Sequence, residues 1–325
     1  MTESSQVHWK AGVVNAVILG LLISGVFGFN YVVDPFDVNR SFSLGLEKRD
    51  VSYNLSNYAW KYPEYLHDPQ PSVILGDSRA RRLPAETFES VHGEGTYNFA
   101  FGGATGGDVI ETFWFALEQG VLKRVYMGLG ALLLNDSIAV ERGRRDRELL
   151  ASPLQYYFSP FVTGASARVV LRHTLGMEGP DETPPMSPEA FWEYQLTVPP
   201  RQYYGAYLYP TKLLERLKEV AAVCAERDIE LVFFMPPTHV ELQAKRMEYE
   251  IEADYQRALR ELELLAPVYD WDYPNAVTQD AALFADPFHP TDSVAERVAQ
   301  ELASGSVLPA GLGFARKTGQ ERRAP

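Results

Sequence analysis

The hydrophobic pattern of the chain begins with one uninterrupted apolar run. Residues 11–33 contain no charged side chain, and a helix of this length would span about 30 Å, the thickness of a bilayer's hydrocarbon core. A cleaved signal peptide or a buried core helix are the alternatives. A cleaved signal would have a more basic start than residues 1–10 and a clear site of small residues after the run. We therefore predict an uncleaved transmembrane anchor over 11–33 that follows a short tail, with membrane lipid as its partner.

After a connector over residues 34–70, which is expected to hold one short helix near 52–61, short apolar runs alternate with helical periodicity. Strands are predicted at 72–75, 97–101, 125–129, 230–235 and 267–271. Helices are predicted at 108–119, 211–227, 240–264 and 292–303. This alternation predicts an α/β domain over 71–304, with three layers and a mostly parallel sheet. In such sheets, binding and catalytic residues gather beyond the carboxyl ends of the strands.

Residues 138–210 interrupt this alternation with a basic stretch, an aromatic cluster and a Pro-rich loop. We interpret them as an insertion that forms a lid or binding loop. The basic run from Arg142 to Arg147 is read as a solvated helix face. Residues 305–325 are small, polar and basic, and are expected to form a flexible tail.

Composition and charge narrow the classes of partner. The chain has 325 residues, 46% of them hydrophobic, which is enough for a large core. Its formal net charge of −13 repels nucleic-acid phosphates, so we expect no nucleic-acid partner. The field would not repel a neutral glycan or an acyl ester. No metal and no cofactor are expected.

Two segments carry residues suited to nucleophilic catalysis. Gly76-Asp77-Ser78-Arg79 directly follows the strand 72–75, so Ser78 lies at the carboxyl edge of the sheet. Asp286-Pro-Phe-His289 precedes the last predicted helix. A serine hydroxyl needs a base to take its proton and an acid to orient that base. Taken singly, helix capping or loop roles explain each segment as well.

A third segment, Asn98-Phe-Ala-Phe-Gly102-Gly103-Ala104-Thr105, follows the second strand. A glycine there lets a backbone N–H approach a developing oxyanion without a side chain in the way. On its own this segment also suits a plain turn. Another residue that follows a strand, His239, could line the same site or lie in a loop.

Together, the order and spacing of these three segments resemble the SGNH, or GDSL-like, hydrolase superfamily over about residues 70–304. The resemblance implies a three-layer α/β/α fold, Ser78 as nucleophile, and Asp286 and His289 as the rest of the triad. It also implies that the Ser78 and Gly103 amides form the oxyanion hole. The third block of the superfamily, Gly-x-Asn-Asp, is displaced here to Asn135-Asp136, so Asn135 is the candidate third donor.

The chain also resembles membrane-anchored members of bacterial envelopes, among them esterases and polysaccharide O-acetyltransferases. Those proteins have an N-terminal anchor followed by Tyr-x-x-Asp-Pro, here Tyr31 to Pro35, and a nucleophile block that ends in Ser-Arg. The resemblance implies a single-pass protein of the cytoplasmic membrane. Lys10 precedes the span, whereas Asp34, Asp37 and Arg40 follow it, and this slight positive-inside bias predicts a catalytic domain on the periplasmic side. A glycan or acyl ester would be its substrate, and a membrane-embedded acyl donor protein would be a further partner.

Three classes of function therefore compete. The first is an esterase or O-acyltransferase, for which acetyl is the expected acyl group. The two forms share one triad and differ only in the acceptor. The second is an inactive SGNH-fold scaffold or glycan-binding module. The third, a nucleotide-binding protein, fits poorly because the Gly-rich segment after Phe101 lacks the spacing and the lysine of the known phosphate-binding loops.

Overall fold

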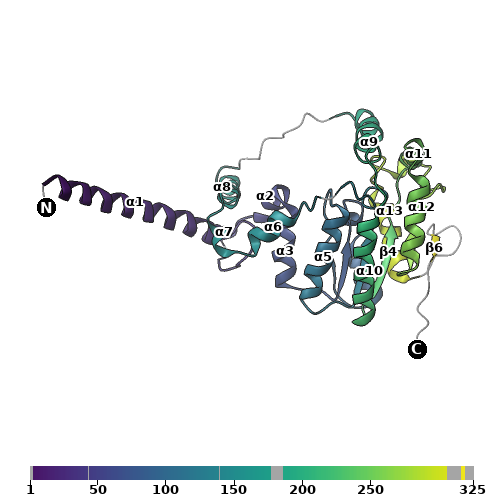
Figure 1. The fold of residues 1–325 in the computed structure, drawn as a ribbon, viewed down its shortest axis with the longest axis horizontal. Coiled ribbons are helices and arrows are strands. Elements are labelled where there is room, and N and C mark those ends of the chain that lie inside the picture. Colours follow the sequence, from purple (N-terminus) through teal and green to yellow (C-terminus); the bar gives the residue numbers. More distant parts are fainter. Residues whose placement is uncertain (1–2, 43, 139, 177–185, 306–315, 319–325) are drawn as a thin grey trace. The chain divides into compact units, whose positions relative to one another are not determined.

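The structure is a computed structural model that describes residues 3–42, 44–138, 140–176, 186–305 and 316–318. The chain divides into two compact units. The first comprises Met1–His67 and Gly143–Thr183, and the second comprises Asp68–Arg142 and Pro184–Pro325. Much of the expected insertion at 138–210 thus groups with the N-terminal segment. Each unit is described by itself below (Figure 1).

The second unit is built on a six-stranded sheet of order β2-β1-β3-β4-β5-β6. The strands are β1 (Ser72–Leu75), β2 (Thr96–Asn98), β3 (Arg124–Gly128), β4 (Glu230–Met235), β5 (Val268–Asp270) and β6 (Arg316–Thr318). All neighbouring pairs are parallel except β5 with β6. In register, Val73 lies beside Tyr97 on one side and Val125 on the other. The prediction of a mostly parallel sheet within an α/β fold is confirmed.

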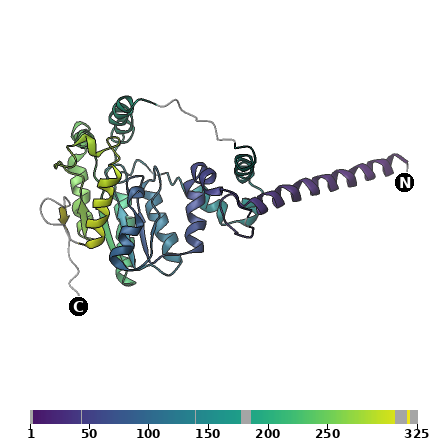
Figure 2. The same cartoon turned by 180° about the vertical axis from the view of Figure 1, so that it is seen from behind.

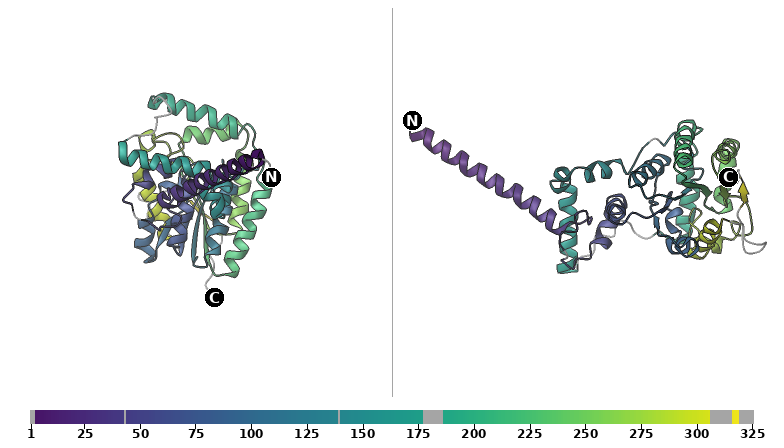
Figure 3. Two further views of the ribbon diagram at one scale, coloured as in Figure 1. Left: turned by 90° about the vertical axis from the view of Figure 1, so that its left-hand side faces the viewer. Right: turned by 90° about the horizontal axis from the view of Figure 1, so that it is seen from below.

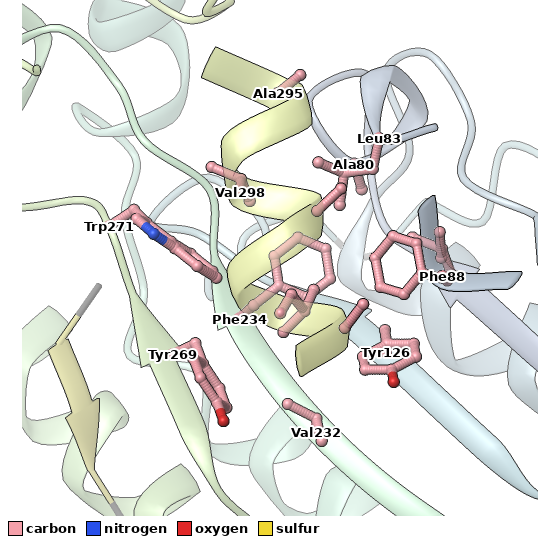
Figure 4. Packing of buried hydrophobic residues seen from close by; sticks show 14 of the residues in the cluster. Ala80, Leu83, Phe88, Tyr126, Val232, Phe234, Tyr269, Trp271, Ala295 and Val298 are labelled. Carbon is pink, nitrogen blue, oxygen red and sulfur yellow. The ribbon is translucent and has the colours of Figure 1, made fainter. Parts of the chain in front are cut away.

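Strands β1, β3 and β4 contribute to a buried hydrophobic cluster of this unit. Strand side chains and helix side chains interlock on one face of the sheet, where α4 (Ala85–His92) and α13 (Asp292–Ser304) contact each other. The cluster includes Ile74 and Val294. Figure 4 labels further members, among them Phe88, Tyr126, Val232, Phe234, Trp271 and Val298. Because successive side chains in a strand point to opposite faces, Val73 and Leu75 face away from this cluster, and both are fully buried.

Two further helices pack on the sheet strands. The helix α5 (Gly106–Glu118) contacts β1, α10 (Thr211–Glu226) contacts β4, and the two helices contact each other. Thr105 begins α5 with a capping box, in which its side chain and that of Asp108 each accept a backbone hydrogen bond from the other residue. Figure 2 shows the same elements from behind, with α13 in yellow.

Some element boundaries differ from those expected. One long helix was predicted over 240–264, but α11 (Val240–Glu248) and α12 (Glu252–Glu263) are separate helices, because Glu250 adopts a positive φ of 57° between them. The second strand ends at Asn98 rather than at residue 101. In the expected tail, Arg316–Thr318 forms β6, where Arg316 pairs with Asp270. The rest of 306–325 lies outside the described residues.

The first unit consists of helices. These are α1 (Glu3–Val33), α2 (Lys48–Leu55), α3 (Asn57–His67), α6 (Arg144–Leu150), α7 (Pro153–Tyr157) and α8 (Pro160–Leu175). The connector therefore holds two helices where one was expected. Within α1, Gly12–Val33 is long and apolar enough to cross a membrane, a property of length and composition that signal sequences share. Figure 3 shows α1 in purple as one continuous helix.

The C-terminal end of α1 is anchored by polar side chains. Asn30 is fully buried and donates to the Tyr157 carbonyl and to the Thr163 hydroxyl, at 2.8 Å each. Asp34, also buried, accepts hydrogen bonds from three successive backbone amides, those of residues 38–40. The Tyr-x-x-Asp-Pro segment thus ends the apolar helix with a tight, hydrogen-bonded turn.

Candidate active site

The turn that follows β1 presents the hydroxyl of Ser78. Gly76 makes this turn with a φ of +147°, and a Cβ there would lie 2.6 Å from the Cβ of Ala80. Only glycine fits that backbone without strain. The residues Ala80–Arg82 then form a single 3₁₀ turn, so Ser78 lies at a sharp strand-to-helix corner at the carboxyl edge of the sheet.

Asn98, the last residue of β2, holds this corner in place. Its side-chain amide donates to the carbonyls of Ala80, at 3.0 Å, and of Leu83, at 2.7 Å. Its carbonyl oxygen accepts from the amide of Ala100 at 3.1 Å. Asn98 therefore links the end of β2 to the nucleophile corner. Past Asn98 the backbone stays bonded to the β1 segment, from the Phe99 amide to the Ile74 carbonyl at 2.8 Å and from the Phe101 amide to the Gly76 carbonyl at 3.0 Å.

The loop before α13 holds Asp286 and His289 in a fixed relation. The Oδ1 atom of Asp286 accepts from the amides of Phe288, at 2.9 Å, and of His289, at 3.2 Å. The backbone bond from Ala285 to the carbonyl of His289, at 2.8 Å, closes the loop. The carboxylate is thus oriented by its own loop before it contacts the imidazole.

Ser78, His289 and Asp286 form a continuous hydrogen-bonded chain. The Ser78 Oγ lies 2.7 Å from His289 Nε2, and His289 Nδ1 lies 2.7 Å from Asp286 Oδ2. A carboxylate can only accept, so Nδ1 carries the proton and Nε2 is left to accept from the serine hydroxyl. Asp286 is 9% and His289 22% exposed in the side chain, so the carboxylate is shielded while the imidazole reaches the pocket. The structure brings all three predicted residues together.

Two backbone N–H groups, that of Ser78 itself and that of Gly103, are available as hydrogen-bond donors. Among the described residues, no hydrogen bond is made by the amide of Ser78 or by that of Gly103. Gly103 has a φ of +67° and lines the same pocket as Ser78 and His289. Free N–H groups at this position can stabilise negative charge on a carbonyl oxygen.

Asn135 does not lie in this pocket, contrary to the expectation that it is the third donor. Its side-chain amide donates to the carbonyl of Tyr203 at 2.9 Å. Its oxygen accepts from the amides of Ser137, at 3.0 Å, and Leu208, at 3.1 Å. Because these bonds satisfy the side chain within the loops after β3 and α9 (Pro188–Tyr203), Asn135 has a structural role.

The pocket has a volume of about 190 Å³ and opens beyond the ends of β1, β2 and β3. Apolar side chains and α9 complete its wall. The residues that line it are Asp77, Ser78, Arg79, Gly103, Ala104, Thr105, Leu132, Leu133, Ile138, Arg142, Gln195, Pro199, Tyr203, Phe288 and His289.

A buried ion pair flanks the nucleophile. Arg79 is 4% exposed and donates to both carboxylate oxygens of Asp77, from Nε at 3.1 Å and from Nη2 at 2.6 Å. Burial alone would raise the pKa of Asp77, but the guanidinium of Arg79 outweighs it and holds that pKa below its usual value. Asp77 therefore stays ionised and keeps Arg79 in place.

The sequence analysis missed part of the pocket wall. Gln195, Pro199 and Tyr203 come from α9, and Arg142 comes from the run that was read as a solvated helix face. None follows a strand directly, so the rule that placed Ser78 could not find them. His239 does not line the pocket. Its ring caps α11 by accepting from the amide of Glu241 and packs edge-on against Trp192.

Comparisons with known proteins find only distant similarity. No protein-family model matches the chain, and no curated protein matches it. Among solved structures, the chain is similar to a Streptococcus pneumonia protein that bears the provisional name platelet activating factor. The TM-score is 0.38 and the identity 10%, over 79% of this chain and 93% of that chain. So distant a likeness says nothing about activity, and the function has to be argued from the site.

Proposed function

We propose that this chain is a serine esterase or O-acyltransferase with a three-layer SGNH-type fold and a short, acetyl-sized acyl group. The observation that carries the proposal is the hydrogen-bonded chain Ser78–His289–Asp286, which ends at a small pocket beside two free backbone amides. The same three side chains in this relation activate serine in unrelated hydrolases.

In the proposed reaction, Ser78 Oγ attacks the ester carbonyl while His289 Nε2 takes its proton. The amides of Ser78 and Gly103 donate to the oxyanion of the tetrahedral intermediate. The imidazolium, stabilised by Asp286, then returns the proton to the leaving alcohol, and an acyl-serine remains. Water as the second acceptor gives an esterase, and a sugar hydroxyl gives an acyltransferase. Both outcomes use the same residues.

A fluorophosphonate probe tests whether the serine is activated. We expect the full chain in detergent to be labelled stoichiometrically at Ser78, because only a serine whose proton is taken by a base attacks phosphorus at a useful rate. Peptide mapping by mass spectrometry identifies the labelled residue. No labelling of the folded chain would favour the inactive scaffold or glycan-binding module instead.

We further propose that α1 is an uncleaved anchor with the sheet-bearing unit on the periplasmic side, where a glycan is the acceptor or substrate. The single lysine before the apolar run, Lys10, gives a slight positive-inside bias. A reporter that is active only in the periplasm, fused after Pro325, should therefore be active. Extraction should need detergent, not high salt, because apolar burial rather than charge would hold the chain. A cytoplasm-only reporter signal would contradict this orientation and leave the proposed triad unaffected.

A further inference from the structure

Three polar side chains of the pocket wall have no partner among the described residues. They are the guanidinium of Arg142, the side-chain amide of Gln195 and the hydroxyl of Tyr203. Polar groups in the wall of a binding pocket fix the orientation of a ligand when they are free to bind it. These three are therefore the groups that can select what binds beside Ser78.

The two arginines of the pocket differ in how their charge is balanced. Arg79 is buried and neutralised by Asp77 through a bidentate contact. Arg142 is exposed, and no carboxylate among the described residues lies within ion-pair distance of it. The adjacent Glu141 is oriented toward Arg216, 3.8 Å away. In a chain of net charge −13, a cation left unpaired at the nucleophile's pocket is available to an anionic ligand.

Gly103 lets this guanidinium lie beside the reactive centre. A Cβ on Gly103 would come within 2.6 Å of Nη1 of Arg142, so the guanidinium occupies the space that any other side chain would need. Gly103 is also a proposed oxyanion donor. A group bound to Arg142 would therefore lie close to a carbonyl held at Ser78.

One face of α9 forms the opposite part of the wall. Gln195, Pro199 and Tyr203 are spaced four residues apart, and this spacing places them on one side of a helix. The position of α9 is fixed within the same unit, because Trp192 donates from Nε1 to Glu241 of α11 at 2.7 Å. The side-chain amide of Gln195 and the hydroxyl of Tyr203 can therefore form hydrogen bonds with hydroxyl groups of a ligand held between α9 and Arg142.

We propose that Arg142 binds a carboxylate on the substrate, so that the pocket selects esters of an acidic, hydroxyl-bearing alcohol such as a uronic acid. This inference rests on the proposed serine esterase or acyltransferase function. A guanidinium matches a carboxylate in bidentate geometry. A single cation balances a carboxylate's one charge, whereas a phosphate dianion would leave net negative charge beside Asp77 and Asp286.

Binding to the Ser78→Ala chain tests the inference without turnover. The probes are 3-acetoxybenzoate and 3-acetoxybenzamide. They share the same acetyl ester and ring, but the first carries a carboxylate where the second carries a neutral amide. We expect the benzoate to bind about tenfold more tightly by calorimetry, since hydrogen bonds to charged groups are the stronger ones. Adding Arg142→Gln should remove the difference, Arg142→Lys should keep part of it, and Arg227→Gln, at an exposed arginine outside the pocket, should keep all of it.

The ratio of the turnover of the two esters distinguishes carboxylate binding by Arg142 from a role of Arg142 at the oxyanion. With Ser78 intact, kcat/KM for the benzoate over that for the benzamide should fall about tenfold in Arg142→Gln. An equal loss for both esters would mean that Arg142 serves the oxyanion, and it would overturn the carboxylate assignment. Equal binding of both probes, no binding of either, or a preference that survives Arg142→Gln would also overturn it. Retained carboxylate binding without acetate release or probe labelling would reject the proposed function alone.

Discussion

The Ser78→Ala chain should lose at least about 10³-fold in kcat/KM for a small chromogenic acetyl ester and should no longer react with a fluorophosphonate. The substitution removes the atom that would form the acyl intermediate. The hydroxyl's one side-chain hydrogen bond is to His289 Nε2, so its loss should lower the free energy of unfolding by only about 1 kcal/mol. A loss of activity with a thermal midpoint lowered by only a few degrees would therefore reflect chemistry rather than folding.

The matched control for this prediction is Ser90→Ala. Ser90 is an exposed serine on α4 whose hydroxyl donates to the carbonyl of Thr87, and it does not line the pocket. We expect this variant to keep its turnover rate and its labelling. Hydrolysis by Ser78→Ala at the rate of the unmodified chain would show that the measured esterase activity does not come from this serine.

The sequence predicted those parts of the fold that depend on local pattern. Continuous apolar runs gave the positions of β1, β3 and β4, because strands of a parallel sheet are buried on both faces. The same pattern overran β2, since Phe99 and Phe101 are also buried and apolar. Past Asn98 the amides of Phe99 and Phe101 still donate to the carbonyls of Ile74 and Gly76, so the apolar pattern marked a segment that follows β1 beyond the last paired residue of the strand.

The sequence also predicted the parts of the candidate site that have a local motif, and it failed where long-range contacts decide the position of a side chain. The residues brought together at the carboxyl edge, Ser78 and His289, each lie in a short segment with a local signature. Asn135 was a candidate because Asn135-Asp136 resembles a displaced third block of the superfamily, yet it is bonded to the Tyr203 carbonyl and the Leu208 amide. Those two partners lie about 70 residues away along the chain. Which hydrogen bonds a polar side chain makes with residues distant in the sequence becomes visible only in the folded structure.

The second large effect is expected at the base and its acid. His289→Ala should lower kcat by at least about 10³-fold, because no other described side chain is placed to take the proton of Ser78. Asp286→Asn should be similarly impaired although it is nearly the same size. The asparagine oxygen can still accept from the amides of Phe288 and His289, but its NH₂ group would then face Nδ1. The imidazole would have to turn its acceptor nitrogen toward that group, which leaves Nε2 protonated and unable to take the proton of Ser78.

His173→Ala serves as the control for histidine removal. His173 is an exposed residue of α8 and does not line the pocket, so its loss should change the free energy of unfolding by no more than about 0.5 kcal/mol and leave turnover unchanged.

Combining His289→Ala or Asp286→Asn with Ser78→Ala decides whether the three residues act as one unit. If they do, the double variants should be no more than about tenfold slower than Ser78→Ala alone, because the remaining rate comes only from the oxyanion donors and binding. The measurement is a double-mutant cycle on kcat/KM, with thermal midpoints recorded for every variant. Losses that multiply in full would assign separate tasks to the residues. The hydrogen bonds at 2.7 Å between Ser78, His289 and Asp286 would then describe a structural contact instead of a proton path.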